Sequence, residues 1–270
     1  MTNVRKGTAL ITGASSGIGA AYADRLARRG YDVILVARNR LRLHELAARL
    51  ESGTDALVGV LAADLTDEAD LRRVERAFGL DSSINLLVNS AGMGLVAPTL
   101  DSNIDTMQQM ISLNVTALTR LNYAAATEFV DRGHGTIINI ASGVALVPEI
   151  LNGVYGASKA FVLGLSQALR QELEGTGVRV QVVMPGAVAT EFWDHAGRPV
   201  EQLPGEIVMS VDDVVDAALA GLDLGEFATL PALPSIEEWN AFDAARVAFR
   251  PKISSAKPAR RYGGGQTAAG

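Results

Sequence analysis

The chain has 270 residues, 48% of them hydrophobic, so it is long and apolar enough to bury the core of one large α/β domain. Its net charge of −6 argues against a surface that follows nucleic-acid phosphates. Because it contains no cysteine, disulfides, thiol nucleophiles and thiolate metal sites are excluded. We expect no metal site, since the three histidines are scattered along the chain: His44, His134 and His195.

Residues 1–6 lead straight into the first predicted strand and leave no room for a signal peptide. No apolar run reaches the length of a membrane span. We therefore expect a cytoplasmic protein without a membrane or nucleic-acid partner.

The first predicted element is a short apolar strand, Thr8–Thr12, which turns abruptly into a glycine-rich loop and a helix over residues 20–29. In such a strand–loop–helix unit, backbone N–H groups at the helix start can hold a pyrophosphate. The spacing over Gly13–Gly19 is Gly-x-x-x-Gly-x-Gly, not the common Gly-x-Gly-x-x-Gly fingerprint. A tight turn without a ligand is the alternative explanation.

The second predicted strand covers residues 31–37 and is followed by two arginines, Arg38 and Arg40. An acidic residue at this strand end selects NAD through the ribose hydroxyls, whereas a guanidinium can bind the 2′-phosphate of NADP. The alternative is that both arginines begin a solvated helix over 41–50, although basic residues are unfavourable at a helix start. We therefore expect NADP in preference to NAD.

Two further apolar strands are predicted over residues 56–63 and 84–88, with a helix between them that opens at Thr66 and ends near Phe78. Apolar strands without alternation, separated by amphipathic helices, are typical of a parallel sheet covered on both faces. Right-handed crossovers then give a single doubly wound α/β sheet of Rossmann type, with ligands at the carboxyl ends of the strands.

One long helix is predicted over residues 103–131, and it carries Asn114 on a mostly apolar stretch. A buried asparagine needs hydrogen-bonding partners. Asn114 is therefore a candidate site residue, and the capping of a neighbouring backbone group is the alternative.

Tyr155 and Lys159 give the strongest chemical signal, because residues four apart share one face of a helix. A phenol has an ordinary pKa of about 10, and a cation one helical turn away favours its phenolate. Ser142 ends the strand predicted over 135–141 and is a candidate hydrogen-bond partner for a substrate oxygen beside the tyrosine. Taken alone, Tyr-x-x-x-Lys also fits a solvated helix, so the context decides.

Beyond a strand over residues 178–184 the chain becomes irregular and contains two adjacent aromatic residues, Phe192 and Trp193. They indicate an apolar wall of a substrate site or, alternatively, packing into the core. Ser210 is predicted to cap a helix that ends at Leu224.

A last strand is predicted over residues 227–230 and an amphipathic helix over 236–249. The following residues have a composition typical of disorder. We expect one catalytic domain over residues 1–250, with a substrate loop at about 187–209, and a flexible tail over 251–270.

In order and spacing, these motifs resemble the short-chain dehydrogenase/reductase family over roughly residues 5–230. The matches are Thr-Gly-x-x-x-Gly-x-Gly at 12–19, Asp64, Asn-x-Ala-Gly at 89–92, Asn114, Ser142, Tyr-x-x-x-Lys at 155–159 and Pro-Gly-x-Val-x-Thr at 185–190. One departure is Ser90, where the family usually has a second asparagine.

The resemblance implies hydride transfer between NADP(H) and a carbonyl or secondary alcohol. Tyr155 would be the general acid in reduction and the base in oxidation, and Ser142 would orient the substrate oxygen. Lys159 would lower the Tyr155 pKa and bind the nicotinamide ribose, while Asn114 would hold a water that links Lys159 to solvent. The implied cofactor-binding residues are Gly13, Ser15, Ser16, Gly17, Ile18, Gly19, Arg38, Arg40, Asp64, Leu65, Asn89, Ala91, Gly92, Tyr155, Lys159, Pro185, Gly186, Val188 and Thr190.

The resemblance also assigns the loop over 187–209 and the segment over 144–152 to a mostly apolar substrate pocket. We therefore expect a hydrophobic carbonyl compound as the substrate. The candidate substrate-contacting residues are Ser142, Val144, Tyr155, Phe192 and Trp193.

An apolar stripe on the helix over 155–174 predicts a homodimer or homotetramer, because monomers seldom leave such a patch exposed. The alternative is that the stripe faces only the chain's own sheet. Its members are Phe161, Leu165, Ala168 and Leu169.

The rival hypothesis is a catalytically inactive nucleotide sensor or scaffold with the same fold. Such a protein is expected to have lost the tyrosine or the lysine, and both are present.

Overall fold

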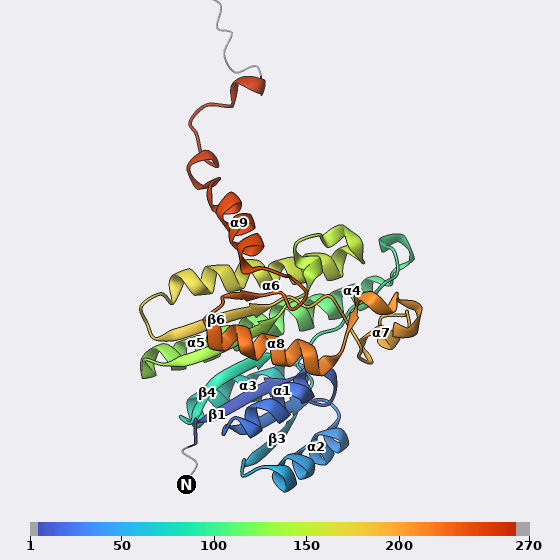
Figure 1. The fold of residues 1–270 in the computed structure, drawn as a ribbon, viewed down its shortest axis with the longest axis vertical. Coiled ribbons are helices and arrows are strands. Elements are labelled where there is room, and N and C mark those ends of the chain that lie inside the picture. Colours follow the sequence, from blue (N-terminus) through green and yellow to red (C-terminus); the bar gives the residue numbers. More distant parts are fainter. Residues whose placement is uncertain (1–4, 263–270) are drawn as a thin grey trace, which may run out of the picture. The chain divides into compact units, whose positions relative to one another are not determined.

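Seven parallel strands form the central sheet of the computed structural model, which describes residues 5–262 (Figure 1). The strand order is β3-β2-β1-β4-β5-β6-β9. The strands are β1 Thr8–Thr12, β2 Asp32–Ala37, β3 Val58–Ala62, β4 Ile84–Asn89, β5 Gly135–Ile140, β6 Val178–Val183 and β9 Ala228–Thr229. The doubly wound parallel sheet predicted from the sequence is confirmed.

Helices cover both faces of the sheet. One buried cluster joins α1, α2 and α8 to the strands, and a second joins α3 and α5 to the opposite face. The helices of this part of the chain are α1 Gly17–Arg28, α2 Arg40–Gly53, α3 Glu68–Leu80, α4 Ile104–Ile111, α5 Leu118–Arg132, α6 Gly153–Glu172, α7 Phe192–His195 and α8 Val211–Leu224.

Strand β1 shows why apolar and polar residues do not alternate along the strands of the sheet. All five of its residues are buried. Ala9 and Ile11 lie in the cluster with α1, whereas Leu10 lies in the cluster with α3 and α5. Because each face of the strand meets a layer of helices, successive residues are apolar.

The strand order reverses at β1, which pairs with both β2 and β4. Thr12 at the end of β1 is level with Val36 in β2 and with Asn89 in β4. The loops that follow β1 and β4 therefore lie at one edge of the sheet, where doubly wound folds bind their ligands.

The predicted helix over 103–131 is interrupted. A π-helical segment, Ser112–Ala117, separates α4 from α5 and contains Asn114. The side chain of Asn114 bonds to both backbone groups of Met93, so a tertiary contact accompanies the change of helical pitch.

Helix α3 does not open at Thr66 as predicted. It begins at Glu68, and Asp67 caps it by accepting a hydrogen bond from the backbone N–H of Asp70. Thr66 instead donates its hydroxyl to the Asp64 carboxylate at 2.7 Å. Thr66 and Asp67 can both cap a helix start, and in the structure Asp67 caps α3.

A second compact unit begins at Leu233, while the first ends at Ala232. The second unit contains α9, Ile236–Val247, on which the rings of Trp239 and Phe242 are 5.6 Å apart. The predicted tail is described as far as Tyr262, and its last eight positions lie outside the described residues. Among residues 5–262, no helix is long and apolar enough to cross a membrane.

Candidate active site

The glycine loop after β1 forms a cradle at the start of α1. Gly13 and Gly17 have φ values of 67° and 51°, in the region that favours glycine. A Cβ on Gly19 would lie 2.4 Å from the carbonyl oxygen of Gly13, so the loop closes tightly on the helix. The first turn of α1 carries no acidic residue, and the Ser16 side chain makes no capping hydrogen bond. The start of α1 thus offers backbone N–H groups and the Ser16 hydroxyl, an arrangement that suits an anion.

The other residues of this loop take different positions. Ser15 lies in the turn before the helix and is partly exposed. Ile18 is partly buried and packs against the core cluster that contains α1. Its side chain therefore anchors the cradle, and the backbone is left to meet a ligand.

Thr12 fastens the glycine loop to the loop after β4. Its hydroxyl accepts hydrogen bonds from the backbone N–H groups of Ser90 and Ala91, both at 3.1 Å. A Cβ on Gly13 would lie 2.9 Å from the backbone of Ala91, so the two loops are in close contact. Gly92 lies beside the catalytic candidates, since its Cβ would be 3.5 Å from Lys159 Nζ.

Arg38 and Arg40 lie where β2 passes into α2. Both are exposed, and neither forms an ion pair within residues 5–262. Asp64 follows β3 and holds Thr66, while Leu65 is buried in the core beside it. The two guanidinium groups are thus available to a phosphate.

Asn89 belongs to a buried polar network that the sequence analysis did not single out. Its amide donates to Asn139 Oδ1 at 2.9 Å, and Asn139 donates to Asn122 Oδ1 and to Ser166 Oγ, both at 3.0 Å. All four residues are at most 3% exposed. The network ties the end of β4 to β5, α5 and α6, and its sequence signal is a polar residue inside an apolar strand, Asn139.

Asn114 is almost fully buried and uses its amide within the protein. Its Nδ2 donates to the carbonyl of Met93 at 2.8 Å and to Ser158 Oγ at 3.0 Å, while its Oδ1 accepts from the Met93 N–H at 3.0 Å. The alternative raised from the sequence, that it caps a neighbouring backbone, describes this geometry.

The first turns of α6 carry Tyr155 and Lys159. Asn152 caps the helix by accepting from the N–H groups of Val154 and Tyr155. Lys159 Nζ lies 5.9 Å from the centroid of the Tyr155 ring and donates to the carbonyl of Ile140, the last residue of β5, at 3.0 Å. The predicted shared face is confirmed.

Burial decides the acidity of both groups. It raises the pKa of Tyr155 to about 12, and a hydrogen bond with Ser142 opposes this rise. Burial also lowers the pKa of Lys159 to about 8. For the protein without cofactor, burial is the larger influence on Tyr155, and the lowering of its pKa by Lys159 stays a prediction for the complex with the nicotinamide cofactor.

The loop after β6 closes the site from the other side. Pro185 accepts hydrogen bonds at its carbonyl from the Gly143 N–H at 2.8 Å and the Ser142 hydroxyl at 3.4 Å. A Cβ on Gly186 would meet no atom within 4 Å. Beyond it, β7 Ala187–Val188 pairs with β8 Val208–Met209, so this small sheet forms the base of the loop predicted to contact the substrate.

Phe192 and Trp193 take different positions. The ring of Phe192 lies 5.5 Å from that of Tyr155, and a Cβ on Gly94 would be 2.2 Å from the Phe192 ring. Trp193 is 8% exposed and donates its indole N–H to the Val188 carbonyl at 3.0 Å. Phe192 is therefore a wall of the site, whereas Trp193 packs within the loop.

An apolar cluster surrounds the tyrosine. Its buried members are Met107, Met110, Val144 and Tyr155, and partly buried apolar residues pack against them: Met93, Leu95, Leu151, Val154 and Phe192. Among residues 5–262, no group of three His, Asp or Glu side chains is arranged to hold a metal. The arrangement suits proton transfer to an oxygen in apolar surroundings.

A glycine cradle lies at the switch point of a doubly wound sheet, with Ser142, Tyr155 and Lys159 at the same edge, where dinucleotide-binding folds hold their ligand. The profile of the short chain dehydrogenase family matches residues 7–200. The chain belongs to this family of oxidoreductases, which use nicotinamide cofactors and act on small molecules.

Two solved structures are similar over nearly the whole chain. A short-chain dehydrogenase from Sphingobium yanoikuyae in complex with NADPH is 48% identical, with a TM-score of 0.91, and the match covers 95% of this chain and 100% of that one. A bulky-bulky ketone specific alcohol dehydrogenase from Comamonas testosteroni is 44% identical, with a TM-score of 0.88, over 97% and 99% of the two chains. Human 17-beta-hydroxysteroid dehydrogenase type 3 is 34% identical over 220 residues, 80% of this chain and 68% of that protein.

Proposed function

We propose that the protein transfers hydride between NADP(H) and a bulky, hydrophobic ketone or the corresponding secondary alcohol. The observation that carries this proposal is Tyr155, buried in an apolar cluster with Ser142 and Lys159 beside it. When bound, the nicotinamide supplies or accepts the hydride.

The roles of the site residues follow from their positions. Tyr155 gives its proton to the substrate oxygen in reduction and takes it back in oxidation. Ser142 hydrogen-bonds the same oxygen, and Lys159 holds the nicotinamide ribose. Asn114 is proposed to position Met93 and Ser158, while its role in a water relay stays a prediction.

The proposed preference for NADP rests on Arg38 and Arg40, two exposed guanidinium groups at the end of β2 with no ion pair in the described chain. A charge-assisted bidentate bond to a 2′-phosphate contributes roughly 1.5–3 kcal/mol. The NADPH complex of the Sphingobium relative supports this choice.

The proposed substrate class rests on the side chains around Tyr155. Met107 and Met110 are adaptable apolar groups, and Phe192 adds an aromatic wall. The ketone specificity stated for the Comamonas relative supports a substrate with large groups on both sides of its carbonyl.

A ketone panel tests the proposal. NADPH oxidation is followed by absorbance with diaryl and aryl-alkyl ketones, small aliphatic ketones and sugars. We expect the highest kcat/KM for ketones with two large apolar groups, and turnover in Tyr155→Phe to fall by at least about 100-fold, the lower range for a general acid. Full activity in this variant, or a preference for sugars, would contradict the proposal. NADPH binding without turnover of any ketone would favour the sensor or scaffold.

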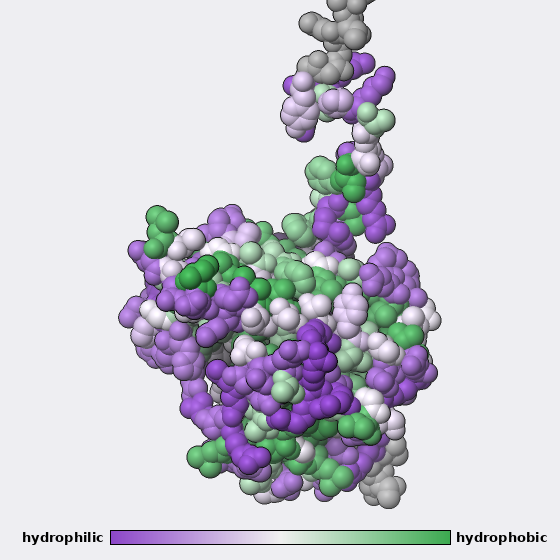
Figure 2. Space-filling model, turned by 180° about the vertical axis from the view of Figure 1, so that it is seen from behind, coloured by the Kyte–Doolittle hydropathy of each residue, from purple (hydrophilic) through white to green (hydrophobic). Residues whose placement is uncertain are grey.

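We also propose that two copies pair through the outer face of α6. Five of its exposed residues share one face without a charge: Gly153, Ala157, Phe161, Gly164 and Ala168. Leu169 is buried against the chain's own core, whereas Phe161 and Ala168 are exposed. The apolar stripe predicted on this helix therefore faces partly inward and partly outward. Figure 2 shows hydrophobic residues gathered across the upper half of the body, at the height of α6 in Figure 1.

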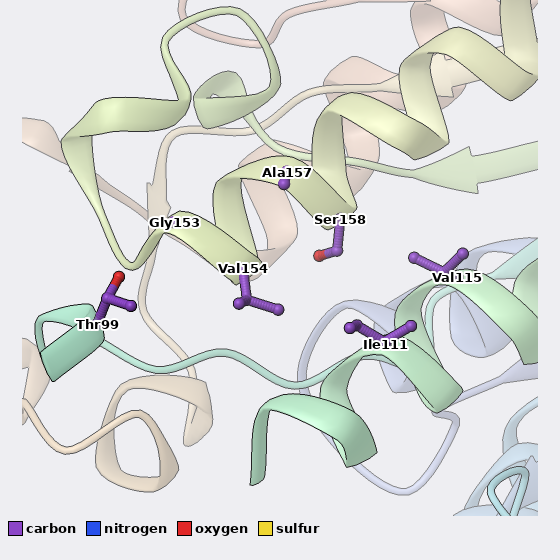
Figure 3. A pocket seen from close by; sticks show the side chains of 7 residues that line it. All are labelled: Thr99, Ile111, Val115, Gly153, Val154, Ala157 and Ser158. Atoms are coloured by element: carbon purple, nitrogen blue, oxygen red, sulfur yellow. The ribbon is translucent and has the colours of Figure 1, made fainter. Parts of the chain in front are cut away.

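A pocket on this face of the helices supports the pairing. It has a volume of about 340 Å³ and lies between the start of α6 and the junction of α4 with the π-helical segment (Figure 3). Its lining residues are mostly apolar: Thr99, Ile111, Val115, Gly153, Val154, Ala157 and Ser158. Because monomers seldom leave such a surface open, a second copy is its proposed cover.

A further inference from the structure

Three successive residues at the start of the substrate loop contact three separate parts of the cofactor cleft. Thr190 lies against the glycine loop, since a Cβ on Gly17 would be 3.1 Å from its Cγ2. Glu191 forms an ion pair with Arg42 of α2 at 2.6 Å. Phe192 packs against Tyr155. The loop therefore spans the cleft from the adenosine end to the catalytic end.

The contact with Arg42 joins parts of the chain that are 149 residues apart. Arg42 is the third residue of α2, and Asn39 fixes this turn by accepting a hydrogen bond from the Arg42 N–H at 3.1 Å. Arg38 lies just before it, at the end of β2. The ion pair thus reaches from the proposed 2′-phosphate end of the cleft to the substrate loop.

The remaining contacts of the loop are of other kinds. Its base is held by the pairing of β7 with β8, and the Val96 N–H donates to the Ala196 carbonyl at 3.0 Å. Within α7, Trp193 bonds back to Val188. Breaking the Arg42–Glu191 pair would therefore leave the base in place and remove the charged contact of the crossing segment, while the contacts of Thr190 and Phe192 remain to be loosened.

We propose that the Arg42–Glu191 ion pair is a clasp that fastens the substrate loop across the cofactor cleft and slows the release of the cofactor. The inference rests on the proposed function only in that the cleft holds a dinucleotide. Arg42 and Glu191 are positioning residues, because neither is assigned a contact with the reacting atoms. Their side chains are 45% and 49% exposed, so the clasp is weak and sensitive to salt, as suits a loop that must open in each cycle.

Intrinsic fluorescence reports on the loop directly. The chain has two tryptophans, and Trp193 lies in the loop, so a Trp239→Phe background leaves one reporter. In this background, acrylamide quenching of Trp193 is measured without cofactor for wild-type loop, Glu191→Gln, Arg42→Gln and the exchanged pair Arg42→Glu/Glu191→Arg. We expect quenching to rise in both single variants and to return towards the starting value in the exchanged pair.

Cofactor release is measured separately by stopped-flow fluorescence. NADH is the probe because it lacks the 2′-phosphate, which could also meet Arg42. We expect each single variant to release NADH about two- to fivefold faster at low salt, the exchanged pair to restore the slow rate, and 0.5 M NaCl to remove the difference. Glu68→Gln, which breaks an exposed ion pair to Arg72 on α3, is the matched control and should change neither readout.

The outcomes separate the clasp from the proposed function. Unchanged quenching and release in both single variants, or no restoration by charge exchange, would overturn the clasp. Faster release of NADH with restoration would support it whatever ketone the protein reduces. If no dinucleotide binds, the proposed function and the role in cofactor release both fall, and the quenching series still decides whether the pair fastens the loop.

Discussion

The burial of Lys159 leads to a prediction about stability that does not depend on catalysis. The residue is 7% exposed, and burial lowers its pKa from 10.5 to about 8. Between these values the unfolded chain binds more protons than the folded chain, so the folded state gains stability as the pH rises. Below pH 8 the full cost of keeping this ammonium buried is about 3 kcal/mol.

Lys159→Met removes the titrating group. The two pKa values imply that wild type gains about 1 kcal/mol over the variant between pH 7 and pH 9. Loss of the bond to the Ile140 carbonyl also costs the variant roughly 1–3 kcal/mol, but this cost is constant with pH. The range stays below the pKa of Tyr155, about 12, and groups common to both proteins cancel.

Urea denaturation without cofactor, at pH 7, 8 and 9, measures the two free energies of unfolding. We expect their difference to shift in favour of wild type at each step. A difference that stays constant from pH 7 to pH 9 would refute the reasoning, because Lys159 would then titrate equally in the folded and unfolded chains.

Three further predictions concern cofactor choice, assembly and the buried network. Arg38→Asp should lower the ratio of kcat/KM for NADPH to that for NADH by about ten- to a hundredfold; an unchanged ratio would remove Arg38 from the cofactor site. Phe161→Glu should shift the mass in light scattering from a multiple of 28.4 kDa to the monomer, and a wild-type monomer would contradict the pairing. Asn139→Ala should lower the free energy of unfolding by about 2–4 kcal/mol in urea, because Asn89, Asn122 and Ser166 lose a buried partner; a loss below about 1 kcal/mol would mean that the network relaxes.

Much of the fold was predictable because its signals are local. The strand before Gly13 is apolar throughout, since it is covered on both faces, and the glycines mark the turn into α1. The spacing of Tyr155 and Lys159 alone places them on one face of a helix. Such patterns need no knowledge of distant parts of the chain.

The remaining features depend on contacts between distant segments. The π-helical turn at Asn114 accompanies bonds to Met93, 21 residues earlier. Asn89 donates a hydrogen bond to Asn139, 50 residues later in the chain, and hydrophobic periodicity does not predict this contact. The raised pKa of Tyr155 has the same origin, because the spacing of a lysine gives its proximity to the tyrosine but not the burial of the phenol.

The electrostatics of the chain itself keep Tyr155 protonated, which is the form needed for reduction. Burial raises the Tyr155 pKa to about 12, so at neutral pH the phenol keeps the proton that a general acid must deliver to a carbonyl. Oxidation needs the phenolate, which the same burial opposes. The contribution that lowers the pKa comes from Ser142 at the end of β5, while the Lys159 ammonium bonds to the Ile140 carbonyl. Ser142 therefore favours the phenolate of Tyr155 through its hydrogen bond, against the effect of burial.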